Sequence, residues 1–100
     1  MANISSSLIL SARRYLRISH TQYDAEITDL IGAARADLLL GGIIRSKVED
    51  ENDDLIRRAI MCYLKAEFGL DNADAGKYRD SYDMLKKHLM LSSEYTTEEA

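Results

Sequence analysis

The sequence predicts a small all-α protein, a single-domain bundle of about four helices. Three observations favour this fold class: the 100 residues contain no proline, only five are glycine, and apolar residues recur at helical spacing along most of the chain. Proline and glycine are the residues that most destabilise helix interiors, so their scarcity removes the usual breaks. A chain of this length forms one core. We expect a helical domain over residues 1–91 and a flexible C-terminal tail over residues 92–100.

The first two helices are predicted on either side of a polar break. A helix over residues 6–16 follows serines that offer N-cap oxygens, and its apolar residues repeat on one side. After the break, Thr21 is the expected N-cap of a second helix, and Asp24 adds a negative charge near the positive end of the helix dipole. Gly41 and Gly42 are expected to end this helix in the left-handed backbone conformation that glycine readily adopts.

The second predicted helix carries a core stripe and then surplus leucines. The stripe consists of residues that share one helical face, namely Tyr23, Ile27, Leu30, Ile31, Ala34 and Leu38. Leu39 and Leu40 follow directly and do not share that face. We predict that Leu39 and Leu40 pack against the following connector or bind the next copy of the chain.

Two further helices are predicted after a charged connector over residues 43–52. The apolar residues within 43–48 are compatible with a short extended piece. The third helix is expected to start near Asp53 and to end at Gly69, and it is apolar nearly all round, which is typical of a central or shared helix. The fourth is expected over residues 75–91, and the polar, acidic end of the chain then trails off as the tail.

Charge is unevenly distributed along this chain of net charge −4. Arg13, Arg14 and Arg17 form a basic cluster in residues 1–20, which hold no acidic residue. We predict that this cluster contacts an acidic partner surface or passing DNA; the alternative is an ordinary solvated helix face. A general DNA-binding protein carries a basic footprint, so the acidic balance argues against tight binding to phosphate.

The acidic segment before the third helix partly matches a calcium-binding loop. Asp50, Asn52 and Asp54 occupy the first, third and fifth positions of that pattern. Leu55 stands where the turn glycine belongs, and Met61 stands where the bidentate glutamate belongs. A capping loop is the better interpretation, and we expect no metal.

The remaining reactive residue types form no catalytic pattern, so we expect no enzyme activity and no cofactor. His20 and His88 have no metal-binding spacing, and Cys62, the single cysteine, lies in the most apolar segment. No apolar stretch approaches the ~20 residues of a membrane span, and no secretory signal is present, so we expect synthesis in the cytoplasm and no membrane contact. Tyr95 lies in the predicted tail, outside every core stripe, and is a candidate anchor into a partner.

Three stretches together resemble the phage head–tail connector proteins, the portal adaptors. They are "YLRISHTQYDAEITDLIGAARADL", "DDLIRRAIMCYLKAEFG" and "YRDSYDMLKKHLMLSSEY", and they cover nearly the whole chain in order. The turn "SHTQYD" has fewer acidic residues than in many relatives, and the 43–52 connector departs from the family pattern.

The resemblance implies a non-enzymatic structural subunit of a tailed phage or prophage virion, assembled in the host cytoplasm. It implies a homo-oligomeric ring, typically dodecameric, that binds the portal protein and presents a platform for the stopper or tail-completion protein. Double-stranded DNA would pass through the ring without sequence-specific binding. The alternative is a small helical nucleic-acid-binding or regulatory adaptor; the ten or so residues between the second and third helices are too many for a helix-turn-helix.

Overall fold

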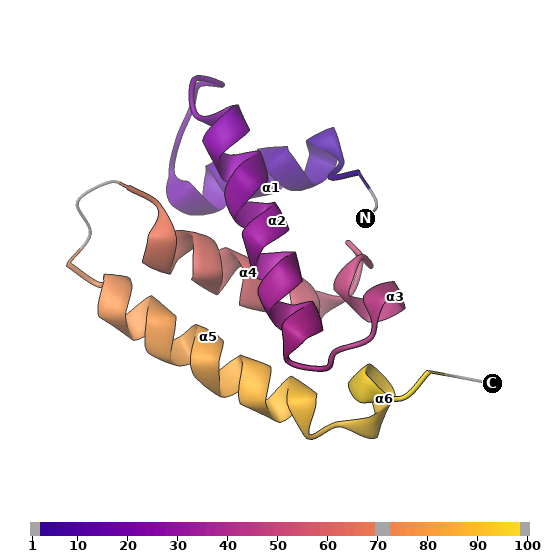
Figure 1. Ribbon diagram of the computed structural model, residues 1–100. Helices are drawn as coiled ribbons and strands as arrows, with labels where there is room; N and C mark the ends of the chain where they lie inside the picture. The colour runs from indigo at the N-terminus through magenta and orange to yellow at the C-terminus, as the bar shows by residue number, and fades with distance from the viewer. Residues whose placement is uncertain (1–2, 70–72, 99–100) are drawn as a thin grey trace.

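A computed structural model describes residues 3–69 and 73–98 of the chain and confirms the all-α class (Figure 1). Its helices are α1 (Ser6–Leu16), α2 (Asp24–Leu40), α3 (Arg45–Val48), α4 (Asp54–Glu67), α5 (Ala75–Met90) and α6 (Ser93–Thr96). The four longer helices correspond to the four predicted ones. The two short helices, α3 and α6, lie in the predicted connector and in the predicted tail.

The helices pack around α4. The most extensive contact pairs α4 with α5, which run side by side in opposite directions, while α2 crosses in front of α4 and α1 lies behind α2 (Figure 1). α3 and α6 lie close together at one end of the molecule. The protein is elongated, 43 × 27 × 19 Å along its principal axes. The nearly all-apolar α4 is therefore the central helix, as its sequence predicts.

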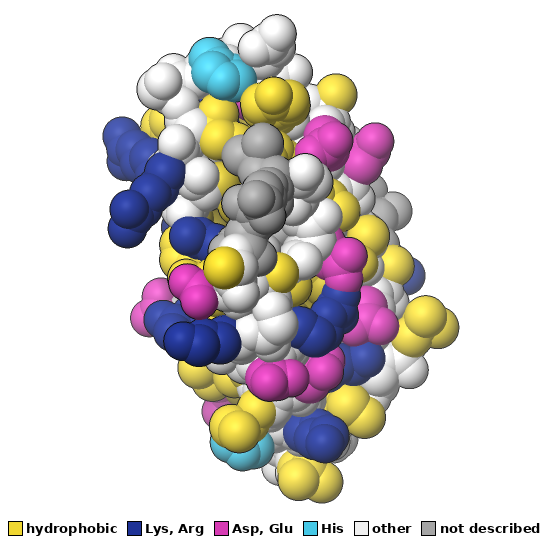
Figure 2. All heavy atoms as spheres, turned by 90° about the vertical axis from the view of Figure 1, so that its left-hand side faces the viewer, with side chains coloured by type: hydrophobic (Ala, Val, Ile, Leu, Met, Phe, Trp, Pro, Cys, Tyr) yellow, Lys and Arg dark blue, Asp and Glu magenta, His cyan; other side chains and the backbone are white. Residues whose placement is uncertain are grey.

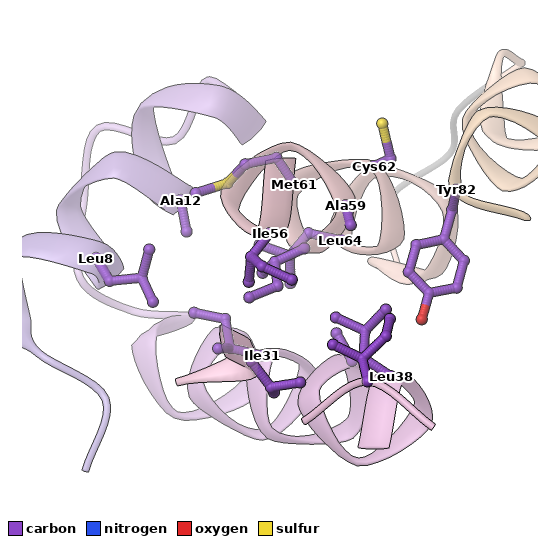
Figure 3. Close-up of a cluster of buried hydrophobic side chains, with 14 of the residues drawn as sticks. Leu8, Ala12, Ile31, Leu38, Ile56, Ala59, Met61, Cys62, Leu64 and Tyr82 are labelled. Carbon is purple, nitrogen blue, oxygen red and sulfur yellow. The ribbon is translucent and has the colours of Figure 1, made fainter. Parts of the chain in front are cut away.

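The core forms where α1, α2 and α4 converge (Figure 3). The predicted stripe of α2 is largely confirmed, because Ile27, Ile31, Ala34 and Leu38 are all fully buried, whereas Tyr23, at the start of the stripe, is 37% exposed. From the other elements the core receives Leu8, Ala12, Ile43, Val48, Ile56, Ala59, Ile60, Met61, Cys62, Leu64, Phe68, Tyr82, Leu89 and Tyr95.

The N-terminal ends of the helices are closed in different ways. α1 begins as predicted, with Ser5 as N-cap and its Oγ accepting the Leu8 N–H at 3.0 Å. The N-cap predicted for α2 is wrong: α2 starts at Asp24, and Tyr23 precedes it without a side-chain capping bond. Thr21 instead accepts the Asp24 N–H through its backbone carbonyl, at 3.1 Å, in the preceding turn. The acidic side chains of the first turn still favour the helix dipole at this end.

The C-terminal end of α2 is a Schellman motif. Gly42, with φ +100°, takes the left-handed conformation, and the Ile43 N–H donates to the Leu38 carbonyl at 3.2 Å. Gly41 itself is right-handed, so only one residue of the predicted glycine pair supplies the left-handed stop. A Cβ at Gly41 would lie 2.9 Å from Lys86 Cε, so a larger residue here would displace the end of that side chain.

α1 ends in the same way but without glycine. Arg17 has φ +61°, and the Ile18 N–H donates to the Arg13 carbonyl at 2.9 Å. A left-handed conformation costs an L-residue about 1–2 kcal/mol. The sharp reversal after α1 is therefore held in place by the packing on either side of it.

The connector is helical, so the prediction of a short extended piece is wrong. Ile44 is extended, and one turn of helix, α3, follows it. The Val48 N–H donates to the Ile44 carbonyl at 3.1 Å, and this turn brings Ile43 and Val48 together into the core. Burial of two apolar side chains outweighs the β-propensity of the isoleucines.

Candidate interaction surfaces

The structure divides the predicted arginine cluster. Arg13 forms an ion pair between α1 and α2, with its Nε 2.9 Å from Asp24 Oδ1. Arg14 and Arg17 are exposed. Arg13 therefore helps to hold the two helices together, and Arg14 and Arg17 supply the positive charge that this corner offers to a partner.

The two surplus leucines also separate. Leu39 is partly buried and packs against the core, whereas Leu40 is 87% exposed. Leu91, after the end of α5, is 86% exposed. Large apolar side chains left this open add nothing to the core, so Leu40 is the member of the pair that suits a partner contact. Leu40 is the last residue of the 17-residue α2, whereas Arg17 precedes the opposite end of this helix, so the two belong to different surfaces.

Tyr95 lies inside the fold, which corrects the expectation of a free tail for residues 92–98. It belongs to α6, is only 7% exposed, and its hydroxyl donates to Asp53 Oδ2 at 3.0 Å. The Ile44 N–H donates to the Tyr95 carbonyl at 2.8 Å, and Lys47 Nζ lies 5.3 Å from the centre of its ring. Residues 99–100 of the predicted tail lie outside the described residues. The end of the chain is thus fastened to the connector and to the start of α4.

The environment of Tyr95 predicts a loss of stability in alkali. Burial, with the neighbouring Asp53 carboxylate, raises the pKa of Tyr95 from 10.0 to about 12. A group whose pKa is raised by folding contributes stability below its unfolded pKa and loses that contribution as the pH rises to the folded pKa. The thermal midpoint should therefore fall between pH 10 and pH 12, and less steeply in Tyr95→Phe than in the wild type. Equal slopes for the two proteins would contradict the attachment of Tyr95 described above.

A polar cluster that links three segments went unpredicted. Arg35 on α2 is 1% exposed, and its Nη2 lies 3.4 Å from Glu51 Oε2. The Glu51 carboxylate also accepts the Ser5 N–H at 3.0 Å and the Ser5 hydroxyl. The start of α1, the middle of α2 and the connector therefore meet at one carboxylate.

A second cluster fastens α2 to α5. Asp37 Oδ2 accepts the Tyr82 hydroxyl at 2.6 Å and the Lys86 ammonium at 3.0 Å. In both clusters burial opposes ionisation, but the donors outweigh it and hold the pKa values of Asp37 and Glu51 below their usual range. The partners lie far apart in sequence, so no local pattern could have shown either cluster.

Two aspartates of the acidic segment before α4 have structural roles. Asp50 accepts the Asn52 N–H in a turn, and Asp53 accepts the Leu55 and Ile56 N–H groups as the N-cap of α4. Over residues 3–69 and 73–98, no three His, Cys, Asp or Glu side chains gather where they could hold a metal ion. In the same described part of the chain, no helix is both long and apolar enough to cross a membrane.

A shallow groove separates α3 from α6. It is lined by Ile44, Ser46, Lys47, Asp50, Ser93, Glu94, Thr97 and Glu98. Lys47 Nζ lies 3.8 Å from Glu94 Oε2 across it. With three carboxylates and one ammonium group among these residues, the groove is acidic and suits a basic partner better than nucleic acid.

A family model described as "Phage connector protein" matches residues 8–96. The chain belongs to this family of phage connectors. The match extends from the first turn of α1 to α6, so it includes both polar clusters apart from Ser5. No curated protein and no solved structure gives a significant match to the chain.

Membership of the phage connector family confirms the resemblance seen in the sequence. It supports a structural role as a head–tail connector and a place in the virion. The six residues predicted to bind partners keep that role as a prediction; they are Arg13, Arg14, Arg17, Leu39, Leu40 and Tyr95. The fold assigns Arg13, Leu39 and Tyr95 to internal contacts, so Arg14, Arg17 and Leu40 are the members that a partner reaches without a rearrangement of the connector.

Proposed function

We propose that this phage connector protein assembles as a ring on the portal, extends the DNA channel of the head and presents a platform for the stopper or tail-completion protein. The observation that carries the proposal is the family match over residues 8–96. The role is mechanical, with no reaction catalysed. Two large apolar side chains, Leu40 and Leu91, are almost fully exposed in the single subunit, which supports contacts with other proteins.

The charge of the subunit suits a conduit for DNA. The net charge is −4, so a ring of such subunits would repel the phosphate backbone overall and let the DNA slide rather than bind it. Many copies held on one portal also add their weak contacts together, so each subunit needs little affinity of its own.

The alternative function, a nucleic-acid-binding or regulatory adaptor, finds less support. A helix-turn-helix joins its helices by a turn of three or four residues, whereas the longer connector that contains α3 separates α2 from α4. Arg13 is held by Asp24, which leaves Arg14 and Arg17 as the exposed pair of the basic cluster.

The test is attachment of the purified protein to portal-bearing heads. Electron microscopy of the mixture should show ring-shaped density below the portal, and heads made without the protein should fail to join tails. Salt-sensitive binding to duplex DNA without attachment to heads would favour the adaptor instead. The predicted use of Tyr95 as an anchor into a partner requires release of α6 first, because Tyr95 is held by Asp53.

A further inference from the structure

The outward face of α1 is basic at one end and apolar in the middle. Ser7, Leu10, Arg14 and Arg17 are all exposed. The spacing of three and four residues places the first three on a single helical stripe, and Arg17 follows as the left-handed C-cap of α1. Leu10 is 40% exposed and lies between Ser7 and the arginines of this face. This stripe points away from Leu8 and Ala12, which face the core.

The outward face of α2 has the complementary order. Glu26, Asp29, Ala33 and Ala36 are exposed and have the same spacing of three, four and three residues, and Leu40 continues the stripe one step further. Its acidic end lies at the start of α2, near the point where the basic end of α1 finishes. The short side chains after the acidic end leave room for a neighbouring helix to approach.

The two stripes lie on different sides of the molecule. In the upper part of Figure 2, which looks at the end where α1 stops and α2 starts, Lys and Arg side chains project at the left edge and Asp and Glu side chains at the right edge. One subunit therefore cannot pair its own basic stripe with its own acidic stripe. A second copy can, since opposite charges then meet across two different faces.

We propose that the outward face of α1 in one copy packs antiparallel on the outward face of α2 in the next copy, and that this contact builds the ring. In this register Arg17 faces Glu26, Arg14 faces Asp29, Leu10 faces Ala33 and Ser7 faces Ala36. The inference rests on the ring of the proposed function and names the surfaces that form it.

A contact between two different faces has the geometry that a ring needs. Each copy uses α1 towards one neighbour and α2 towards the other, so association continues from copy to copy until the ring closes. Exposed ion pairs contribute little to affinity individually, but they select the register, and Leu10 and Leu40 supply apolar area. Because both faces lie outside the core, they are available without refolding of the subunit.

Charge reversal tests the pairing directly. Arg14→Glu with Arg17→Glu, and separately Glu26→Arg with Asp29→Arg, should each lower self-association, measured by sedimentation velocity and by rings counted on portal-bearing heads, at least tenfold. The four changes combined should restore association to within about threefold of the wild type, because the charges are complementary again. Failure of the combined variant to recover, or wild-type assembly by both reversed pairs, would overturn the proposed interface.

Matched controls separate the interface from general charge effects. Lys87→Glu alters the last turn of α5 as Arg14→Glu alters that of α1, and Asp54→Arg alters the first turn of α4 as Glu26→Arg alters that of α2. Both control positions are exposed, and both control variants should assemble normally. Circular dichroism and thermal melting show which variants are folded.

Neutral variants keep the test decisive if a reversed pair does not fold. Arg14→Gln with Arg17→Gln, or Glu26→Gln with Asp29→Asn, should flatten the dependence of self-association on salt, and an unchanged salt dependence would overturn the interface. The ring itself is judged on the wild type. If wild-type protein forms no ring on the portal, the proposed function fails; if rings form in every variant, the function stands and this interface is wrong.

Discussion

Replacement of Glu51 by alanine is expected to lower the free energy of unfolding by about 3 kcal/mol. The change removes the Glu51 carboxylate from the guanidinium of Arg35, which is 1% exposed, and it removes the acceptor of the Ser5 N–H and hydroxyl. Removing one partner of a buried ion pair is costly because the other charge stays out of water. Chemical denaturation followed by circular dichroism measures the change.

Two further variants isolate the cause. Arg45→Ala, also in the connector, removes a guanidinium that is 57% exposed and should cost less than about 0.5 kcal/mol. Arg35→Met combined with Glu51→Leu replaces both charges by apolar groups and should recover much of the stability lost in Glu51→Ala. A Glu51→Ala protein as stable as Arg45→Ala would contradict the structural role of the cluster.

Low pH should weaken the same cluster of Arg35, Glu51 and Ser5. Folding lowers the pKa of Glu51, so its contribution to stability is present above its unfolded value of 4.5 and is lost as the pH falls through the lower, folded value. The wild type should therefore lose stability below pH 4.5 more steeply than Glu51→Ala.

Replacement of Leu38 by alanine is expected to cost about 2–5 kcal/mol, while replacement of Leu40 by serine should leave stability almost unchanged. Leu38 is fully buried and Leu40 is 87% exposed, although only one residue separates them. Chemical denaturation of the two variants makes the comparison. The expected effect of Leu40→Ser is instead on association with other copies, since Leu40 continues the exposed stripe of α2.

Leu39 needs separate treatment from Leu40. It packs against the core, so Leu39→Ser should destabilise the subunit, and a double replacement would confuse unfolding with loss of assembly. An unfolded Leu40→Ser protein would show that Leu40 is an ordinary core residue and would remove it from the proposed assembly surface.

The four long helices could be predicted because their information is local. The helix expected over residues 6–16 coincides with α1, and the stripe of α2 from Ile27 to Leu38 is buried except for Leu30, which is partly buried. Apolar periodicity and a capping serine are readable from a few neighbouring residues. Hence the fold class and the family resemblance followed from the same short-range patterns.

The errors arose where distant residues decide the local structure. Thr21 had the sequence of an N-cap, but α2 starts further along, at Asp24, whose carboxylate pairs with Arg13 on α1. Segment 93–96 looked polar and free, but its tyrosine is held by groups 42 residues away and more in sequence. The buried Arg35 likewise pairs with Glu51, which is 16 residues away, and helical spacing does not show which polar residues will pair.

The double use of Asp53 has a mechanical consequence for a protein that joins two parts of a virion. Its carboxylate accepts the Leu55 and Ile56 N–H groups at the start of α4 and the hydroxyl of Tyr95, while the carbonyl of the same tyrosine accepts the Ile44 N–H. A pull on the end of the chain is thus transmitted to the connector and to the base of the central helix, as well as to α5. Force on the C-terminal end would therefore be distributed over the connector, α4 and α5.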